Sequence, residues 1–299
     1  MIKPNVFIIG AQKSATTSLY NWLSQHPNVC GPSSIKDYPF FITCWDNFDE
    51  ESKMLDKEYL DSGYSNQKIV LHGSVQYMFE EKAIDRIFEF DPNAKLICTL
   101  RDPTERAISA HKYFKKLNLE TKSLKQALDL DEEFLNGTLQ QRHDFTYKSH
   151  GLYAKQLEYV FKKFNKDQVL VFLYEDIRDN PVDVIEKAHN FLEIDDSFSP
   201  ELIHANATGE IKFKLFQKLI FNNNKFKKFI VDNIVDPFIP LHKRSKIRWA
   251  LSEWNTKSPN HVIKKDEYEE ERVLLKKYFK EDILKLEQII KRNLDSWKE

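Results

Sequence analysis

The residues best suited to chemistry lie between Gly10 and Leu19, and they read Gly-Ala-Gln-Lys-Ser-Ala-Thr-Thr-Ser-Leu. The apolar run Val6–Ile9 precedes them, and a helical pattern follows through Leu23. This order predicts a buried strand, a short loop and the start of a helix. Backbone N–H groups at such a helix start are unpaired and point the same way, so they can bind a phosphate. The predicted ligand-binding residues of the loop are Gln12, Lys13, Ser14, Ala15, Thr16, Thr17 and Ser18.

This loop differs from that of a nucleotide-hydrolysing protein. A Walker loop reads G-x-x-x-x-G-K-[ST], with the lysine beside a hydroxyl that holds magnesium. Here Lys13 stands three residues after Gly10, and the second glycine is missing. A lysine in this place can reach the far end of a nucleotide's 5′ chain, where a leaving oxygen gains charge. An ATP-dependent P-loop kinase stays open as an alternative, although the chain has no Gly-Lys-Ser/Thr sequence and no clear Walker B partner.

A second motif follows another predicted strand, Lys95–Leu100. It reads Arg-Asp-Pro-Thr-Glu-Arg-Ala-Ile-Ser from Arg101 to Ser109. Pro103 suits the first turn of a helix, so Arg101 is expected at the strand exit and Ser109 about two turns into the helix. A guanidinium and a hydroxyl placed in this way can bind a second, separate phosphate.

Together these motifs resemble those of sulfotransferases that use 3′-phosphoadenosine 5′-phosphosulfate (PAPS) as the donor. Gly10–Leu19 resembles the 5′-phosphosulfate loop of that family, and Arg101–Ser109 resembles its 3′-phosphate motif. A third block matches in the same order: Gly151–Leu157, Val169–Ile177, Asn180-Pro181 and Phe191-Leu192. The likeness is to the carbohydrate and heparan-sulfate branch and to soluble bacterial-type members. It implies a sulfuryl transfer from PAPS to a hydroxyl or amine of an acceptor, a carbohydrate or another small metabolite, without a metal.

The resemblance also implies roles for the donor-binding residues. The amides of Gln12 to Ser18 would hold the 5′-phosphosulfate, and Lys13 would stabilise charge on its bridging oxygen. Arg101 and Ser109 would hold the 3′-phosphate. Lys212 and Lys214 fall where a late basic loop of the family closes over the donor, although the Lys-Gly-Arg sequence of the Golgi members is absent.

Two residues are candidates for the base that takes the acceptor's proton. Many carbohydrate sulfotransferases carry Lys-Glu-x-x-Phe-Phe with the glutamate as base, and the matching run Lys36–Phe41 places Asp37 there. The next family block resembles Glu-x-Ser-Pro-x-Tyr, and His72 takes the place of its acidic residue, with Gly73 where some members have a catalytic lysine. A histidine has a suitable pKa for a base, but it can equally be a packed residue. Asp37 is the first candidate and His72 the second. A homologue that binds the nucleotide without a working base also stays open.

The predicted elements place these motifs at one edge of a sheet. Strands are expected at Asn5–Ile9, Lys68–His72, Lys95–Leu100 and Gln168–Leu173. Helices are expected at Thr17–Gln25, Glu80–Phe90, Pro103–Lys116, Leu124–Leu135, Leu152–Phe164 and Pro181–Leu192. This alternation predicts an α/β protein with a P-loop NTPase-like three-layer fold, in which helices flank a central parallel sheet and ligands bind at the carboxyl ends of the strands.

Further expectations concern segments outside the two phosphate motifs. Asp46–Asn66 and Gln140–His150 are expected as surface excursions, the second at the border of the acceptor site. His111 and Tyr113 either line that site or pack in the core, and Asp176 is expected to support the fold. Apolar residues at helical spacing predict a C-terminal packing helix within Asp266–Trp297.

Length and composition limit the number of domains and the classes of partner that the chain can have. At 299 residues the chain is expected to form one domain, residues 1–299, with a donor-binding core at 1–195 and a basic helical segment plus packing helix at 196–299. The 45 basic and 46 acidic residues nearly cancel, so no nucleic-acid partner is predicted. Three cysteines without metal-ligand spacing predict no metal site. With no signal peptide or membrane span in the sequence, a cytoplasmic location is expected. Three interpretations of the basic stretch 212–248 stay open: a solvated pair of helices, peripheral contact with a membrane, and contact with an anionic polymer. The oligomeric state is not predicted.

Overall fold

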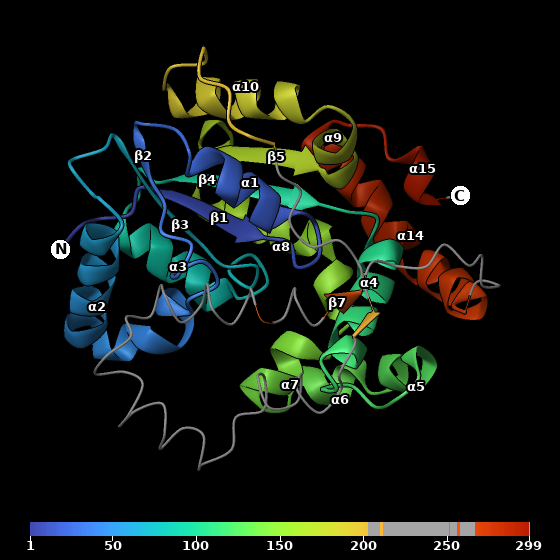
Figure 1. Cartoon of the computed structure of the whole chain (residues 1–299). Helices are drawn as coiled ribbons and strands as arrows, with labels where there is room; N and C mark the ends of the chain where they lie inside the picture. The colour runs from blue at the N-terminus through green and yellow to red at the C-terminus, as the bar shows by residue number, and fades with distance from the viewer. Residues whose placement is uncertain (203–209, 212–250, 252–255, 258–266, 299) are drawn as a thin grey trace.

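Four buried apolar runs and one short additional strand form a parallel sheet at the centre of the molecule (Figure 1). The computed structural model describes residues 1–202, 210–211, 251, 256–257 and 267–298. The strand order is β2-β3-β1-β4-β5. The strands are β1 (Val6–Gly10), β2 (Val29–Cys30), β3 (Ile69–Gly73), β4 (Lys95–Leu100) and β5 (Val169–Leu173). A separate antiparallel pair joins β6 (Glu210–Ile211) to β7 (Thr256–Lys257).

Side chains that alternate along the strands make a core on each face of the sheet. Phe7 and Ile9 of β1 belong to one apolar cluster, and Val6 and Ile8 belong to the other. Helices α1 (Thr16–Leu23) and α10 (Pro181–Leu192) cover the second cluster. Helices α3 (Glu81–Phe90), α8 (Tyr153–Lys163) and α14 (Glu269–Ile290) cover the first (Figure 1). The predicted three-layer α/β fold is therefore confirmed.

The remaining elements lie around this three-layer core (Figure 1). They are η1 (Phe40–Cys44), η2 (Trp45–Asn47), α2 (Phe48–Asp61), α4 (Pro103–Lys116), α5 (Leu124–Asp129), α6 (Asp131–Leu135), α7 (Leu139–Asp144), η3 (Ser149–Gly151), η4 (Lys166–Gln168), α9 (Tyr174–Asp179) and α15 (Asp295–Lys298). Helix α4 begins as its sequence predicts, because the Asp102 carboxylate accepts a hydrogen bond from the Thr104 N–H at 2.8 Å and Pro103 occupies the first turn.

Three of the predicted segments are wrong in detail. Asp46–Asn66 is not only a surface excursion, since it contains α2, whose Leu55 and Tyr59 are buried one turn apart. The sparse apolar residues of this polar stretch hide the helical period. The predicted helix Leu124–Leu135 divides into α5 and α6. The second half of Gln140–His150 packs inward, with His150 buried.

The C-terminal helix packs as its periodicity predicts. Leu275, Phe279, Ile283 and Leu286 are buried, and α14 packs against α8 and α4. Asp176 supports this arrangement, because its carboxylate pairs with Arg292 just after α14. Lys212, Lys214 and the rest of the stretch 212–248 lie outside the described residues, so the division of the chain at residue 195 stays a prediction. Among the helices of the described ranges, none is both long enough and apolar enough to cross a membrane.

Candidate active site

The loop between β1 and α1 has the backbone shape of an anion site. Lys13 and Ala15 both have a φ of 66°, and the residues between and before them do not, so successive N–H groups turn toward one side. Such alternation forms a concave nest of amides that favours an anion. Helix α1 adds its own N-terminal amides, since no side chain caps it and its first turn holds no acidic residue.

The side chains of the loop divide into two groups. Ser14, Thr16 and Ser18 are buried, whereas Gln12, Lys13, Ala15 and Thr17 are partly exposed. Ser14 lies against Tyr153 of α8, beneath the loop. The buried members thus hold the shape of the loop, and the exposed members line the surface that a ligand would contact.

Lys13 is the most perturbed cation of the site. Burial, and next the positive charge of Arg101, lower the pKa of Lys13 from its ordinary value of 10.5 to about 8. Lys36 and Lys116 act in the same direction, and the Asp37 carboxylate opposes them. The Lys13 ammonium lies 4.0 Å from the centre of the Tyr113 ring, which attracts a cation. Four cations and one carboxylate therefore share this edge of the sheet, an arrangement that suits a ligand with several negative charges.

Arg101 joins the two motifs directly. Its Nη1 donates a hydrogen bond to the backbone oxygen of Lys13 at 3.4 Å, and its guanidinium lies 4.6 Å from the centre of the Tyr174 ring. This arrangement orients Arg101 at the carboxyl end of β4, beside the phosphate loop. Ser109 lies on α4 and is partly exposed. The two predicted phosphate motifs, separated by about ninety residues of sequence, thus meet at one edge of the sheet, as parallel strands require.

Asp37 reaches the same edge from the segment after β2. Its backbone N–H donates to the Gly73 oxygen at the end of β3 at 2.8 Å, and its Oδ1 accepts a hydrogen bond from the Val75 N–H at 3.0 Å. Lys36 Nζ donates to Oδ2 at 2.8 Å. The Asp37 side chain remains 46% exposed. It is a fixed and accessible carboxylate that interacts electrostatically with Lys13.

His72 has a different environment. It is fully buried on β3, and its ring packs against Phe7, Phe41 and Tyr77. Its Nδ1 lies 3.4 Å from the Tyr77 hydroxyl, and its Nε2 has no hydrogen-bond partner among the described residues. Burial lowers the pKa of His72 to about 3. The imidazole is therefore neutral and enclosed by aromatic rings at neutral pH.

A polar network, which the sequence alone did not indicate, forms one wall beside the loop. Gln12 and Gln76 both donate from Nε2 to the His143 backbone oxygen, at 3.3 and 3.1 Å. The Glu80 carboxylate contacts His143 Nε2 at 2.8 Å and Arg142 at 2.6 Å. This network fixes α7 and the chain after it against the loop. The sequence signal that pointed toward this network was the expectation that Gln140–His150 borders the acceptor site.

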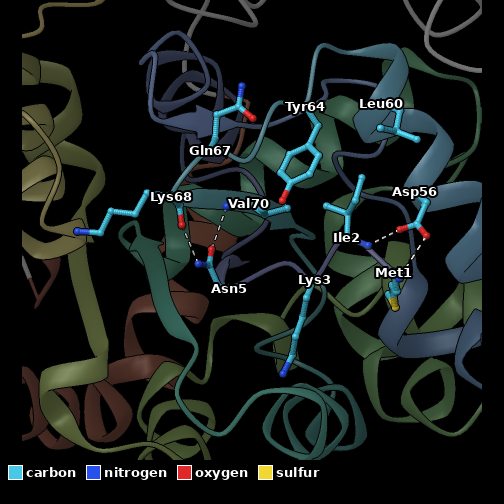
Figure 2. A pocket seen from close by; sticks show the side chains of 10 residues that line it. All are labelled: Met1, Ile2, Lys3, Asn5, Asp56, Leu60, Tyr64, Gln67, Lys68 and Val70. Atoms are coloured by element: carbon cyan, nitrogen blue, oxygen red, sulfur yellow. Dashed lines mark hydrogen bonds and ion pairs between the residues drawn. The ribbon is translucent and has the colours of Figure 1, made fainter.

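One cavity lies away from this site (Figure 2). It has a volume of about 560 Å³ and is lined by Asn5, Lys68 and Val70, which stand before or at the amino ends of β1 and β3. Figure 2 shows Asn5 between two backbone groups, donating to the Lys68 oxygen and accepting from the Val70 N–H. The phosphate loop lies at the opposite, carboxyl ends of these strands, so this cavity is not part of the candidate site.

The fold and the two motifs at the carboxyl ends of β1 and β4 define an α/β protein with a candidate site for an anionic ligand. Comparison with known proteins identifies the family. The family described as "Sulfotransferase domain" matches residues 3–230, and the chain belongs to it.

Individual relatives are distant. The chain is 25% identical over 204 residues to the bifunctional heparan sulfate N-deacetylase/N-sulfotransferase 1 of Caenorhabditis briggsae, a match that covers 64% of this chain and 23% of that protein. It is 26% identical over 222 residues to the heparan sulfate glucosamine 3-O-sulfotransferase 5 of Homo sapiens, covering 73% of this chain and 61% of that protein. The chain thus spans less than two thirds of the length of these relatives.

A solved structure matches the whole chain. The crystal structure of a sulfotransferase from Alicyclobacillus acidocaldarius is 24% identical, covers 100% of both chains and superposes with a TM-score of 0.69. At this identity the match shows a common fold.

Proposed function

We propose that this chain transfers a sulfuryl group from PAPS to a hydroxyl or amine of an acceptor. The observation that carries the proposal is the contact between Arg101 and Lys13, because it brings two phosphate-binding motifs into one site. A donor with a 5′-phosphosulfate and a separate 3′-phosphate has its negative charges at two such places. Membership of the sulfotransferase family supports this donor and does not favour the kinase alternative.

The donor would be held by both motifs. The amides from Gln12 to Ser18 and the Lys13 ammonium would bind the 5′-phosphosulfate, and Arg101 with Ser109 would bind the 3′-phosphate. Lys212 and Lys214 are proposed as further donor contacts, and both lie outside the described residues. The three partly exposed polar residues of the loop, Gln12, Lys13 and Thr17, fit this role because a ligand can reach them.

Asp37 is proposed as the base, ahead of His72. It is accessible and fixed by hydrogen bonds at both oxygens, whereas His72 is enclosed and strongly disfavours a proton. Asp37 would take the proton of the acceptor as the acceptor oxygen or nitrogen forms its bond to sulfur. The bond between sulfur and the bridging oxygen breaks, and that phosphate oxygen keeps the electron pair. Lys13 would stabilise the charge that develops there.

We propose a metal-independent reaction. Magnesium neutralises the leaving phosphate in a kinase, and here Lys13, Lys36, Arg101 and Lys116 gather enough positive charge to do so. The acceptor is proposed to be a carbohydrate, on the strength of the heparan sulfate relatives, with another small metabolite as the alternative. A cytoplasmic location, peripheral membrane contact and the oligomeric state stay untested.

A transfer assay tests this function. The protein is incubated with ³⁵S-labelled PAPS and EDTA, together with desulfated heparan sulfate, an alkyl alcohol or a phenol. The expected result is label in at least one acceptor, with none for Lys13→Ala. Transfer of ³²P from ATP that requires magnesium, without any transfer of ³⁵S, would support the kinase instead.

A further inference from the structure

We infer that Lys36 is a positioning residue for the transfer reaction, which holds the Asp37 carboxylate in place and releases its own positive charge toward Lys13 when Asp37 takes the proton. This role rests on the proposed function. Neither the phosphate loop nor the 3′-phosphate motif contains Lys36.

The burial of Lys36 is the first observation. Its side chain is only 8% exposed, although a lysine usually keeps its ammonium in water. Removing an ammonium from water is costly unless a charge compensates for it. The Asp37 carboxylate, with Oδ2 at 2.8 Å, supplies that charge. The largely buried Lys36 ammonium therefore forms an ion pair with the Asp37 carboxylate, unlike a solvated lysine on the surface.

The way Asp37 is held is the second observation. Lys36 Nζ contacts Oδ2, and the Val75 N–H contacts Oδ1. The backbone of Asp37 is itself fixed, with a φ of 67° and a hydrogen bond to the Gly73 oxygen. Each carboxylate oxygen can accept more than one hydrogen bond, so each keeps capacity for the acceptor's proton. Without Lys36, Oδ2 loses its donor and the carboxylate is held only at Oδ1, by the Val75 N–H.

The third observation is the position of Lys36 relative to the other charged groups. Asp37 interacts with Lys13 of the loop, and it also acts on the buried Tyr20 of α1, His72 of β3 and Tyr77 after β3. Of the groups facing this pair, Lys13 is the cation that the proposed function assigns to the leaving oxygen. Lys36 is itself close enough to Lys13 to lower its pKa.

These observations connect the two ends of the reaction. Before transfer, the Asp37 charge cancels much of the Lys36 charge. When the acceptor proton passes to Asp37, that carboxyl becomes neutral and Lys36 loses its counter-charge. Its full positive charge then acts at the Lys13 end, where the phosphate oxygen keeps the electron pair of the broken bond to sulfur. Removal of the proton and stabilisation of the leaving group are thereby coupled through one ion pair.

A double-mutant cycle tests this role. Lys36→Met is expected to lower kcat about 10- to 100-fold, within the range that general-base catalysis contributes, and to change the affinity for 3′-phosphoadenosine 5′-phosphate (PAP) less than twofold. Because Lys36 positions Asp37, its effect on proton removal is absent in the Asp37→Asn background, so the double variant should lose much less than the product of the two single losses. Lys36→Arg, which keeps the charge, should recover part of kcat. Lys36→Ala should regain part of kcat with n-propylammonium, which restores the positive charge beside Asp37.

Lys187→Met is the matched control, since Lys187 Nζ also lies 2.8 Å from a carboxylate, that of Asp183, but is 61% exposed on α10. It should leave kcat unchanged. Multiplicative losses in the double variant, a normal kcat in Lys36→Met, or a loss of PAP affinity as large as the loss of kcat would each overturn the role of Lys36. A wild-type protein that transfers no label to any acceptor would instead overturn the proposed function, and this role with it.

Discussion

Replacement of Lys13 by methionine should stabilise the ligand-free protein while it abolishes transfer. Methionine keeps much of the length and the apolar stem of lysine but removes the charge that burial and Arg101 disfavour. Lowering the pKa of Lys13 from 10.5 to about 8 corresponds to about 3 kcal/mol of unfavourable free energy for the charged form, at about 1.36 kcal/mol per pKa unit. The variant also loses the favourable contact between the Lys13 ammonium and the Tyr113 ring, and this loss reduces the gain in stability by about 1 kcal/mol. The expected gain in unfolding free energy at pH 7 is therefore about 1–3 kcal/mol.

The pH dependence of this gain follows from the direction of the shift. Below pH 8, Lys13 is charged in both the folded and the unfolded protein, so the whole cost is present. Between pH 8 and 10.5, the folded protein binds fewer protons than the unfolded chain, and the stability contribution of Lys13 rises with pH. The difference between Lys13→Met and wild type should thus be largest below pH 8 and shrink toward pH 10.5.

Urea denaturation of both proteins at several pH values measures this difference, and calorimetry with PAP measures the loss of donor binding in the same samples. Destabilisation of ligand-free Lys13→Met by more than 1 kcal/mol, or an undiminished kcat, would refute the reasoning. The first result would mean that the lysine supports the fold, and the second that it has no part in transfer.

Three further predictions concern other parts of the site. Asp37→Asn should lower kcat about 100- to 10,000-fold at unchanged PAP affinity, whereas His72→Phe, which fills an aromatic environment, should keep kcat within threefold; the reverse order in a steady-state assay would make His72 the base. Glu80→Gln loses its ion pair with Arg142 and its contact with His143. The KM for the acceptor should therefore rise, while PAP affinity measured by calorimetry stays the same. Equal losses of acceptor and PAP affinity would mean that the polar network around Glu80 borders the donor. Asp176→Ala breaks the pair with Arg292 and should cost about 1–2 kcal/mol of unfolding free energy in urea without changing kcat; a loss of kcat at full stability would give Asp176 a direct role.

Local sequence patterns predicted most of the fold because each core element carries its own signal. The apolar runs of β1, β3, β4 and β5 are dense, and their observed bounds differ from the predicted ones by no more than one residue. Pro103 marked the start of α4. Helix α2 was missed because its buried residues are few among many charged ones, so only contact with the rest of the core reveals its inner face.

The meeting of the two phosphate motifs was predictable, since both follow strands of one parallel sheet. The contacts that make them a single site were not. The hydrogen bond from Arg101 to the Lys13 oxygen, and the stacking of Arg101 on Tyr174, depend on tertiary positions that no local pattern encodes. The burial of Lys36 is a further example, because a lysine beside an aspartate reads equally well as a solvated pair until the path of the chain is known.

Calorimetric titration with PAP, AMP and ATP, without metal, tests most directly whether the two motifs form one donor site. PAP should bind much more tightly than AMP, because only PAP carries the 3′-phosphate that Arg101 and Ser109 are placed to hold. This preference should disappear in Arg101→Ala, while AMP affinity changes little. If PAP binds no more tightly than ATP, or if Arg101→Ala keeps the preference for PAP, the central claim is contradicted.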